Sequence, residues 1–136
     1  MTSTGTSDAF GSLAGAMLTR IAVDDSLTLD LRRADGLSCT VRLDGNLRYT
    51  GASGASFEAC VESQAERIGP LFTHLFERVD AVEIMANGAL CLRFGHAELQ
   101  ALPHAHAVAW KVSTSGGFAA ACLEDGRVVT SRAEAA

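Results

Sequence analysis

Residues 20–41, RIAVDDSLTLDLRRADGLSCTV, and residues 81–101, AVEIMANGALCLRFGHAELQA, decide the fold, because each alternates apolar and polar positions over short runs. Strict alternation is typical of β-strands that bury one face and expose the other. The segments align with an offset of 61 residues, which places Ile21 on Val82, Leu29 on Leu90, Leu31 on Leu92 and Arg32 on Arg93. The sequence therefore predicts two similar three-stranded antiparallel meanders.

Glycine-containing turns indicate further strands outside the meanders. Hairpin signals stand at Asp44-Gly45-Asn46, Ser115-Gly116-Gly117 and Asp125-Gly126. The expected strands are 17–23, 26–32, 37–43, 47–50, 79–85, 89–94, 98–102, 107–113, 118–123 and 128–131.

Between the meanders the apolar positions change to a spacing of three and four. This spacing favours an amphipathic helix, and it is carried by Phe57, Val61, Ile68, Phe72 and Leu75. The expected fold is α+β and mainly β, with two similar antiparallel β-meanders that form a curved or split sheet. One helical segment, about 57–77, is expected to be packed on that sheet.

The 136 residues fit one domain with its own core, and a hydrophobic content of 48% is that of a globular protein. Residues 1–12 and 132–136 are small and polar, so we expect disordered tails there. The single β-rich domain is expected to span 13–131.

The net charge of −5 and the pI of about 5.2 argue against nucleic acid or an anionic membrane as partner, because both attract basic surfaces. No apolar stretch reaches the roughly 18 residues of a bilayer-spanning helix. The first residues also lack the basic region of a secretory signal. We therefore expect a cytoplasmic protein.

The four cysteines are far apart in the sequence, and they form no C-x-x-C pair. Cys39, Cys91 and Cys122 alternate with apolar neighbours, as free thiols that face a core do. A disulfide framework is not expected in a cytosolic chain of this size.

The second half carries a recognisable pattern. It reads Asn87-Gly88-Ala89-Leu90-Cys91-Leu92-Arg93-Phe94, then Pro103, Ala109-Trp110 and Gly116-Gly117. This resembles a family of small actinobacterial proteins of unknown function with a G-x-L-x-L-x-F, P-x-x-x-Y-E-A-W and Gly-Gly pattern. Ala107 and Val108 replace its Tyr and Glu. The resemblance implies no activity, and only by analogy of class does it suggest immunity proteins that act beside bacterial toxins.

Three histidines offer an alternative metal site. His104 and His106 would point to one face of an extended segment, and His96 lies one strand earlier. Three imidazoles can bind zinc, but a solvated connection with incidental histidines is the plainer interpretation. We therefore expect no metal and no other cofactor. The chain also has no nucleophile elbow, so we assign no catalytic residue and expect no enzyme.

Glu58, Glu62 and Glu66 recur every four residues and would share one face of the predicted helix. An acidic stripe fits a basic partner, although a solvated face is the plainer alternative. Trp110 is either a core anchor or an exposed interface residue, with the core as the plainer interpretation, and Phe72 and Phe76 on the helix offer the same choice. Glu58, Glu62, Glu66 and Trp110 are the candidate partner-binding residues.

The leading hypothesis is a non-catalytic protein-binding module, an immunity-type inhibitor that binds and blocks a toxin. One alternative is a small-molecule or metal-binding β-barrel-like domain that uses His96, His104 and His106. Another is a structural homodimer in which edge strand 128–131 pairs with its twin. Monomer and homodimer both remain open.

Overall fold

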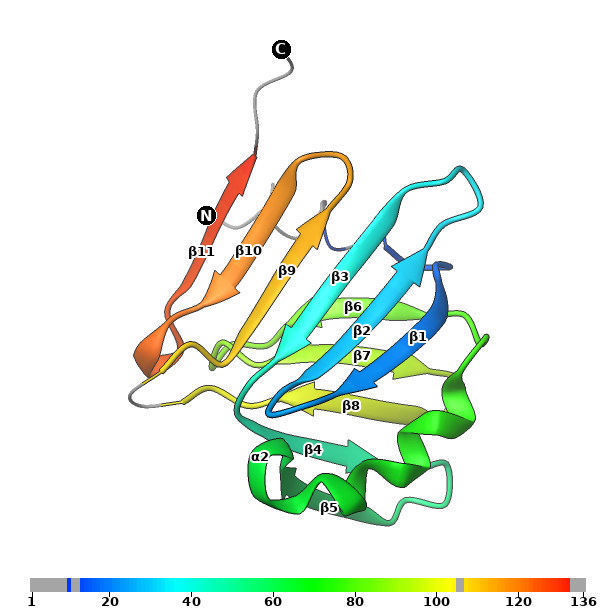
Figure 1. Ribbon diagram of the computed structural model, residues 1–136, viewed down its shortest axis with the longest axis vertical. Coiled ribbons are helices and arrows are strands. Elements are labelled where there is room, and N and C mark those ends of the chain that lie inside the picture. The colour runs from blue at the N-terminus through cyan, green and yellow to red at the C-terminus, as the bar shows by residue number, and fades with distance from the viewer. Residues whose placement is uncertain (1–9, 11–12, 105–106, 133–136) are drawn as a thin grey trace.

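The computed structural model describes residues 10, 13–104 and 107–132, and these fold into two antiparallel sheets that face each other (Figure 1). The six-stranded sheet has the order β1 (Met17–Val23), β2 (Leu27–Arg32), β3 (Ser38–Leu43), β9 (Trp110–Thr114), β10 (Phe118–Cys122) and β11 (Val128–Arg132). The five-stranded sheet has the order β5 (Ser56–Cys60), β4 (Asn46–Thr50), β8 (Ala97–Ala101), β7 (Leu90–Phe94) and β6 (Ala81–Ile84).

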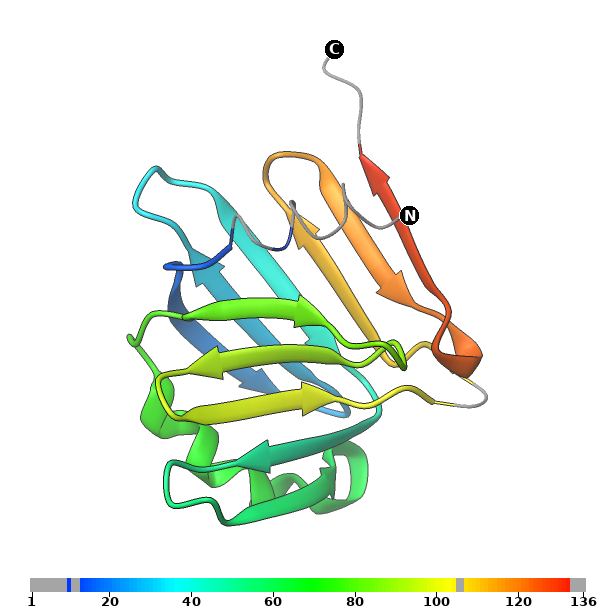
Figure 2. The same cartoon turned by 180° about the vertical axis from the view of Figure 1, so that it is seen from behind.

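The strands of one sheet run across those of the other, with the six-stranded sheet in front in Figure 1 and the five-stranded sheet in front in Figure 2. Alternate residues of each strand point into the space between the sheets and form one core. Those that are almost fully buried include Leu27, Leu29, Leu31, Val41, Leu43, Leu90, Leu92, Leu99 and Trp110. The predicted mainly β α+β fold with a split sheet is confirmed.

The two halves of the chain follow the same path: three strands enter one sheet, and the next two enter the other sheet. Strands β1–β3 begin the six-stranded sheet, after which the chain crosses over and adds β4 and β5 to the five-stranded sheet. Strands β6–β8 begin the five-stranded sheet, and the chain then crosses back and adds β9 and β10. The predicted repeat therefore includes two further hairpins, and each half of the chain contributes strands to both sheets. Gly54 and Gly117 match as well, with φ values of 90° and 94° in equivalent turns.

The hairpin registers shift part of the predicted alignment. Val23 pairs with Leu27 before the β1–β2 turn, and Ile84 pairs with Leu90 before the β6–β7 turn. If these end pairs are equivalent, Leu29 matches Leu92 and not Leu90. The cause is turn length, because residues 24–26 separate one pair and residues 85–89 the other. The offset of 61 does hold for β1 and β6.

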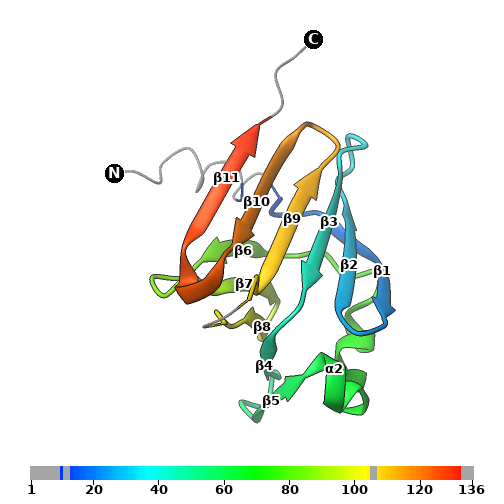
Figure 3. The ribbon, with the colours of Figure 1, turned by 60° about the vertical axis from the view of Figure 1, so that its left-hand side comes forward.

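The helical segment begins later than predicted. Residues 57–60 belong to β5, which pairs with β4. Helix α2 (Val61–Gln64) follows, and the 3₁₀ helix η1 (Ala65–His74) continues from it. This segment lies at the side of the two sheets, near β5 and β1 (Figure 3). Two of its own residues, Ile68 and Leu71, are buried.

The predicted domain limits miss one core residue. Phe10, expected in the disordered tail, is buried and packs edge-on against the rings of Trp110 and Phe118, with centroids 6.1 and 5.4 Å away. The rest of the predicted tails, residues 1–9, 11–12 and 133–136, lies outside the described residues. At the other end η2 (Glu124–Gly126) leads into β11, which includes residue 132.

Candidate functional site

The segments that precede β1 and β6 are equivalent in the repeat, and they pair with each other. Each hydrogen bond of this pairing has a counterpart, in which both residues are replaced by their equivalents 61 positions away. The amides of Gly15 and Phe76 donate to the carbonyls of Val79 (2.7 Å) and Leu18 (2.6 Å), while those of Val79 and Leu18 donate to the carbonyls of Ala16 (2.8 Å) and Glu77 (2.9 Å). Such mutual pairing is the geometry of a local two-fold axis.

Three neighbouring positions break this symmetry in their chemistry. Between the first segment and the second, Leu13 becomes His74, Gly15 becomes Phe76 and Ala16 becomes Glu77. The first segment shows that the shared backbone needs no polar or aromatic side chain at these positions. The second segment therefore carries groups that the fold does not require, and we take it as the candidate functional site.

Phe76 is the most unusual of the three. Its φ is 70°, in the left-handed region, whereas the equivalent Gly15 has φ 89°. A bulky residue is rare in this region because its Cβ crowds the backbone. The side chain is also 67% exposed, and Phe72, four residues earlier, is 43% exposed. Two aromatic side chains therefore project from the end of η1.

His74 joins two other polar side chains in a hydrogen-bonded chain. Its Nδ1 lies 2.8 Å from Glu77 Oε1, and its Nε2 lies 2.8 Å from Tyr49 Oη. An ionised carboxylate can only accept, so Nδ1 carries the proton, and in the neutral imidazole the Tyr49 hydroxyl then donates to Nε2. Burial, with a smaller contribution from Glu77, raises the pKa of Tyr49. The hydroxyl therefore keeps its proton, which it can share with the imidazole.

An open cavity of about 650 Å³ lies beside this chain. It forms where the β4–β5 turn, the end of η1 and the β7–β8 turn meet. Tyr49, His74 and Phe94 supply aromatic walls, and His74 stacks on Phe94 with centroids 4.9 Å apart. Glu77, Arg78 and Asp80 contribute charged groups, and His96 also lines the cavity.

The predicted acidic stripe does not form on one helix. Glu58 lies on β5 and pairs across the sheet with Arg48, whose Nη2 is 2.7 Å from Glu58 Oε2. Only Glu62, on α2, and Glu66, on η1, share the helical segment. Both are exposed, and neither forms an ion pair within the described part of the chain.

Trp110 is a core anchor and not a surface residue. It is fully buried, and its indole Nε1 donates to the Gly88 carbonyl at 2.9 Å. The candidate role of Trp110 in partner binding is therefore wrong for this fold, since no part of the ring reaches the surface.

The histidines do not come together as the alternative metal site required. His96 precedes β8 and His104 follows it, so five residues of extended strand separate them. At about 3.3 Å per residue, they lie at opposite ends of that strand. His106 lies outside the described residues, and no group of three His, Cys, Asp or Glu side chains in the described ranges could hold a metal ion.

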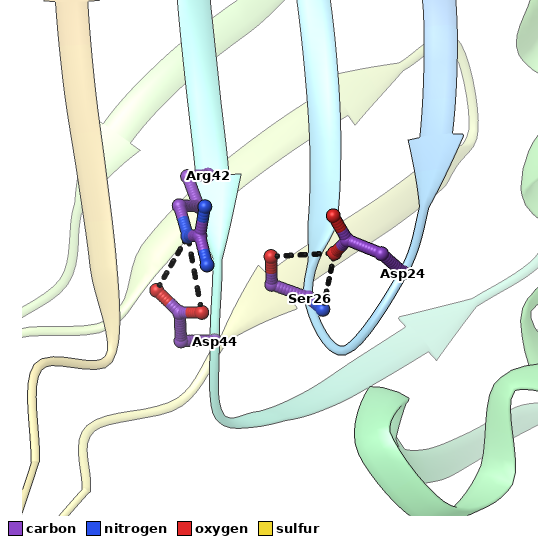
Figure 4. Close-up of polar contacts among 4 residues, drawn as sticks. All are labelled: Asp24, Ser26, Arg42 and Asp44. Atoms are coloured by element: carbon purple, nitrogen blue, oxygen red, sulfur yellow. Dashed lines mark hydrogen bonds and ion pairs between the residues drawn. The ribbon is translucent and has the colours of Figure 1, made fainter.

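Two other acidic residues serve the local structure (Figure 4). In the β1–β2 turn, Asp24 Oδ1 accepts from the Ser26 amide at 2.8 Å and from Ser26 Oγ at 3.1 Å. These bonds hold the pKa of Asp24 below its ordinary value. At the β3–β4 crossover both Asp44 carboxylate oxygens lie 3.2 Å from Arg42 Nε. Neither carboxylate needs a partner molecule to explain it.

Sequence reasoning missed Tyr49, His74 and Glu77 and favoured the core for Phe76, which is exposed, although the repeat contained the signal. Extending the offset of 61 residues towards the N-terminus aligns Leu13 with His74 and Gly15 with Phe76. The sequence therefore shows where the repeat is broken. Only the structure shows that Phe76 occupies a left-handed backbone conformation. Among those predicted residues that the structure describes, only His96 lies at the cavity.

Taken together, the molecule is a two-sheet β-protein with an internal repeat and an open cavity, lined by aromatic and charged residues, at one broken repeat position. The chain belongs to the family of unknown function DUF6188, whose model matches residues 10–132. No curated protein and no solved structure gives a significant match. Within the described residues, no helix is long and apolar enough to cross a membrane.

Proposed function

We propose that this protein is a non-catalytic protein-binding module of the immunity type, which binds a basic partner such as a toxin and blocks it. The observation that carries the proposal is the exposed ring of Phe76 on a left-handed backbone. Such a conformation costs about 1–2 kcal/mol, and a ring that is mostly in solvent returns little packing energy. Contact of the ring with another molecule would offset this cost.

We define the docking surface as Phe72, Phe76, Glu62 and Glu66. Exposed aromatic side chains at a rigid site are typical of the residues that dominate protein interfaces. The two glutamates lie on the same helical segment, and no ion pair within the described residues neutralises them. Together with the net charge of −5, they favour a basic partner. Four free cysteines agree with a cytoplasmic location, where thiols remain reduced.

The test is affinity capture of the tagged chain from its native lysate, with wild type compared to Phe72→Ala and Phe76→Ala. We expect one stoichiometric basic protein, with an affinity that falls at least about tenfold in each variant. Val129→Ala is the matched control, because Val129 is also an exposed apolar residue (40%) but lies on β11. An affinity that does not change when Phe72→Ala and Phe76→Ala are combined would overturn the docking surface.

Single substitutions test how much each of the three predicted glutamates contributes to partner binding. Glu62→Lys and Glu66→Lys should weaken the complex and reduce its salt dependence. Glu58→Gln should matter less, because Glu58 is already paired with Arg48. Capture of a second copy of this chain would instead support the homodimer and contradict the immunity-type function.

A further inference from the structure

The cavity beside Tyr49, His74 and Glu77 has a lining that suits a positively charged organic group. Tyr49 and Phe94 contribute aromatic rings to its wall, with His74 stacked on one face of Phe94, and aromatic rings attract cations. The Glu77 side chain is 52% exposed and uses Oε1 for His74, so its second oxygen remains available. Asp80 uses Oδ2 for the Gly95 amide, which leaves Oδ1.

The charge of the lining is also negative. Two carboxylates, Glu77 and Asp80, face one guanidinium, that of Arg78. The Arg78 Nη1 donates to the Gly15 carbonyl at 3.1 Å, so this cation is tied to the pairing of the two segments. An anion would have to approach two carboxylates, whereas a cation is attracted by them.

The repeat shows that this polarity is not a requirement of the fold. The equivalents of His74 and Glu77 in the first half are Leu13 and Ala16, and both are buried apolar residues. The same backbone is therefore stable without a hydrogen-bonded chain. In the second half, the Tyr49 hydroxyl and the Glu77 carboxylate fix the His74 ring against Phe94, which gives the cavity a rigid wall.

We infer that this cavity is a binding site for an alkylammonium or guanidinium group, seated beside the aromatic wall of Tyr49, His74 and Phe94 and against the carboxylates of Glu77 and Asp80. The cation can come from a free amine or from a lysine or arginine side chain of a protein. The inference goes beyond the proposed function and does not depend on it, because small cations can test the site alone.

The experiment is an NMR titration of the whole chain with n-butylammonium, n-butylguanidinium, butyrate and 1-butanol. We expect saturable amide shifts at Tyr49, Glu77 and Phe94 with the two cations only. Glu77→Gln should weaken cation binding about tenfold, since one charge-assisted contact is lost. Its amide oxygen can still accept from His74, so the histidine stays in place. Glu124→Gln is the matched control, because Glu124 is exposed and lies on η2.

Equal shifts with butyrate or butanol, or no saturable shift with either cation, would overturn the inference. A second comparison identifies the source of the cation. Tighter binding of N-acetyl-lysine methylamide than of n-butylammonium indicates a protein side chain, and the reverse order indicates a free amine. If the cations do not bind while Phe76→Ala still weakens partner binding at least about tenfold, the cavity site fails and the proposed docking surface stands.

Discussion

At the scale of single residues, Phe76 combines a backbone suited to glycine with a side chain that is mostly in solvent. The amide of Phe76 donates to the Leu18 carbonyl, so the pairing of the two repeat segments fixes the conformation. Gly15 holds the equivalent conformation without strain. The ring is therefore presented in one direction before any partner arrives, which lowers the entropy cost of binding.

This reasoning predicts that Phe76→Gly stabilises the protein. Relief of about 1–2 kcal/mol of backbone strain should exceed the roughly 0.5–1 kcal/mol by which glycine favours the unfolded chain. We expect the free energy of unfolding to rise by about 0.5–1 kcal/mol in denaturant titrations, while partner binding is lost. Phe76→Ala keeps the Cβ atom and should show no such gain. A glycine variant less stable than the alanine variant would contradict the strain argument.

The cysteines give a second prediction at this scale. Burial raises the pKa of Cys39 to about 12 and that of Cys91 to about 11, and it also raises the pKa of Cys122. Cys60 is the only one of the four that is not buried. Iodoacetamide at neutral pH should therefore modify Cys60 alone in the folded protein and all four after denaturation, as read by mass spectrometry. Equally fast modification of Cys91 would contradict this burial.

Cys91 also shows what the alternation pattern cannot predict. The pattern placed it on the core face, but its register partners Gln100 and Glu83 belong to the outer face of the five-stranded sheet. It is nevertheless fully buried. Alternation gives the face of a strand, but it does not show that long side chains nearby, such as Arg93 on the same strand and Glu98 on β8, can cover a small thiol.

At the scale of elements, hairpins were predictable where a glycine turn separates two alternating runs. Strand β5 was not predictable from the sequence. Phe57 and Val61 are four residues apart, and this spacing fits a helix as well as a strand that ends at Cys60. Pairing of Glu58 with Arg48 across the sheet, together with the Gly54 turn, decides for the strand. The local pattern fits both a helix and a strand, and long-range pairing therefore decides between them.

A contact between two turns gives a prediction for elements. Gly88, in the β6–β7 turn, has φ 93°, and a Cβ atom there would overlap the backbone carbonyl of Gly126 on η2. Gly88→Ala should therefore combine backbone strain with a backbone collision. Gly36 has φ 95° but open space around it, so Gly36→Ala tests strain alone. We expect Gly88→Ala to lower the free energy of unfolding by about 1–3 kcal/mol more than Gly36→Ala. Equal losses in denaturant titrations would show that the two turns can move apart.

At the scale of the whole molecule, the repeat predicted two meanders but not the sheets to which they belong. The crossovers at residues 44–45 and 102–109 decide this, and nothing in their composition shows which sheet the next strand joins. The candidate site was hidden for a related reason. His74, Tyr49 and Phe94 come from three elements that only the assembled sheets bring together.

The exchange of strands between the halves also determines when the chain can fold during its synthesis. Strand β3 finds its second neighbour only in β9, and β4 finds its own only in β8. A ribosome that has delivered β1–β5 has thus produced two incomplete sheets with exposed apolar faces. Contacts between distant residues form late and slowly. Neither half is a folding unit, so the nascent chain must stay soluble until most of β9 and β10 has emerged.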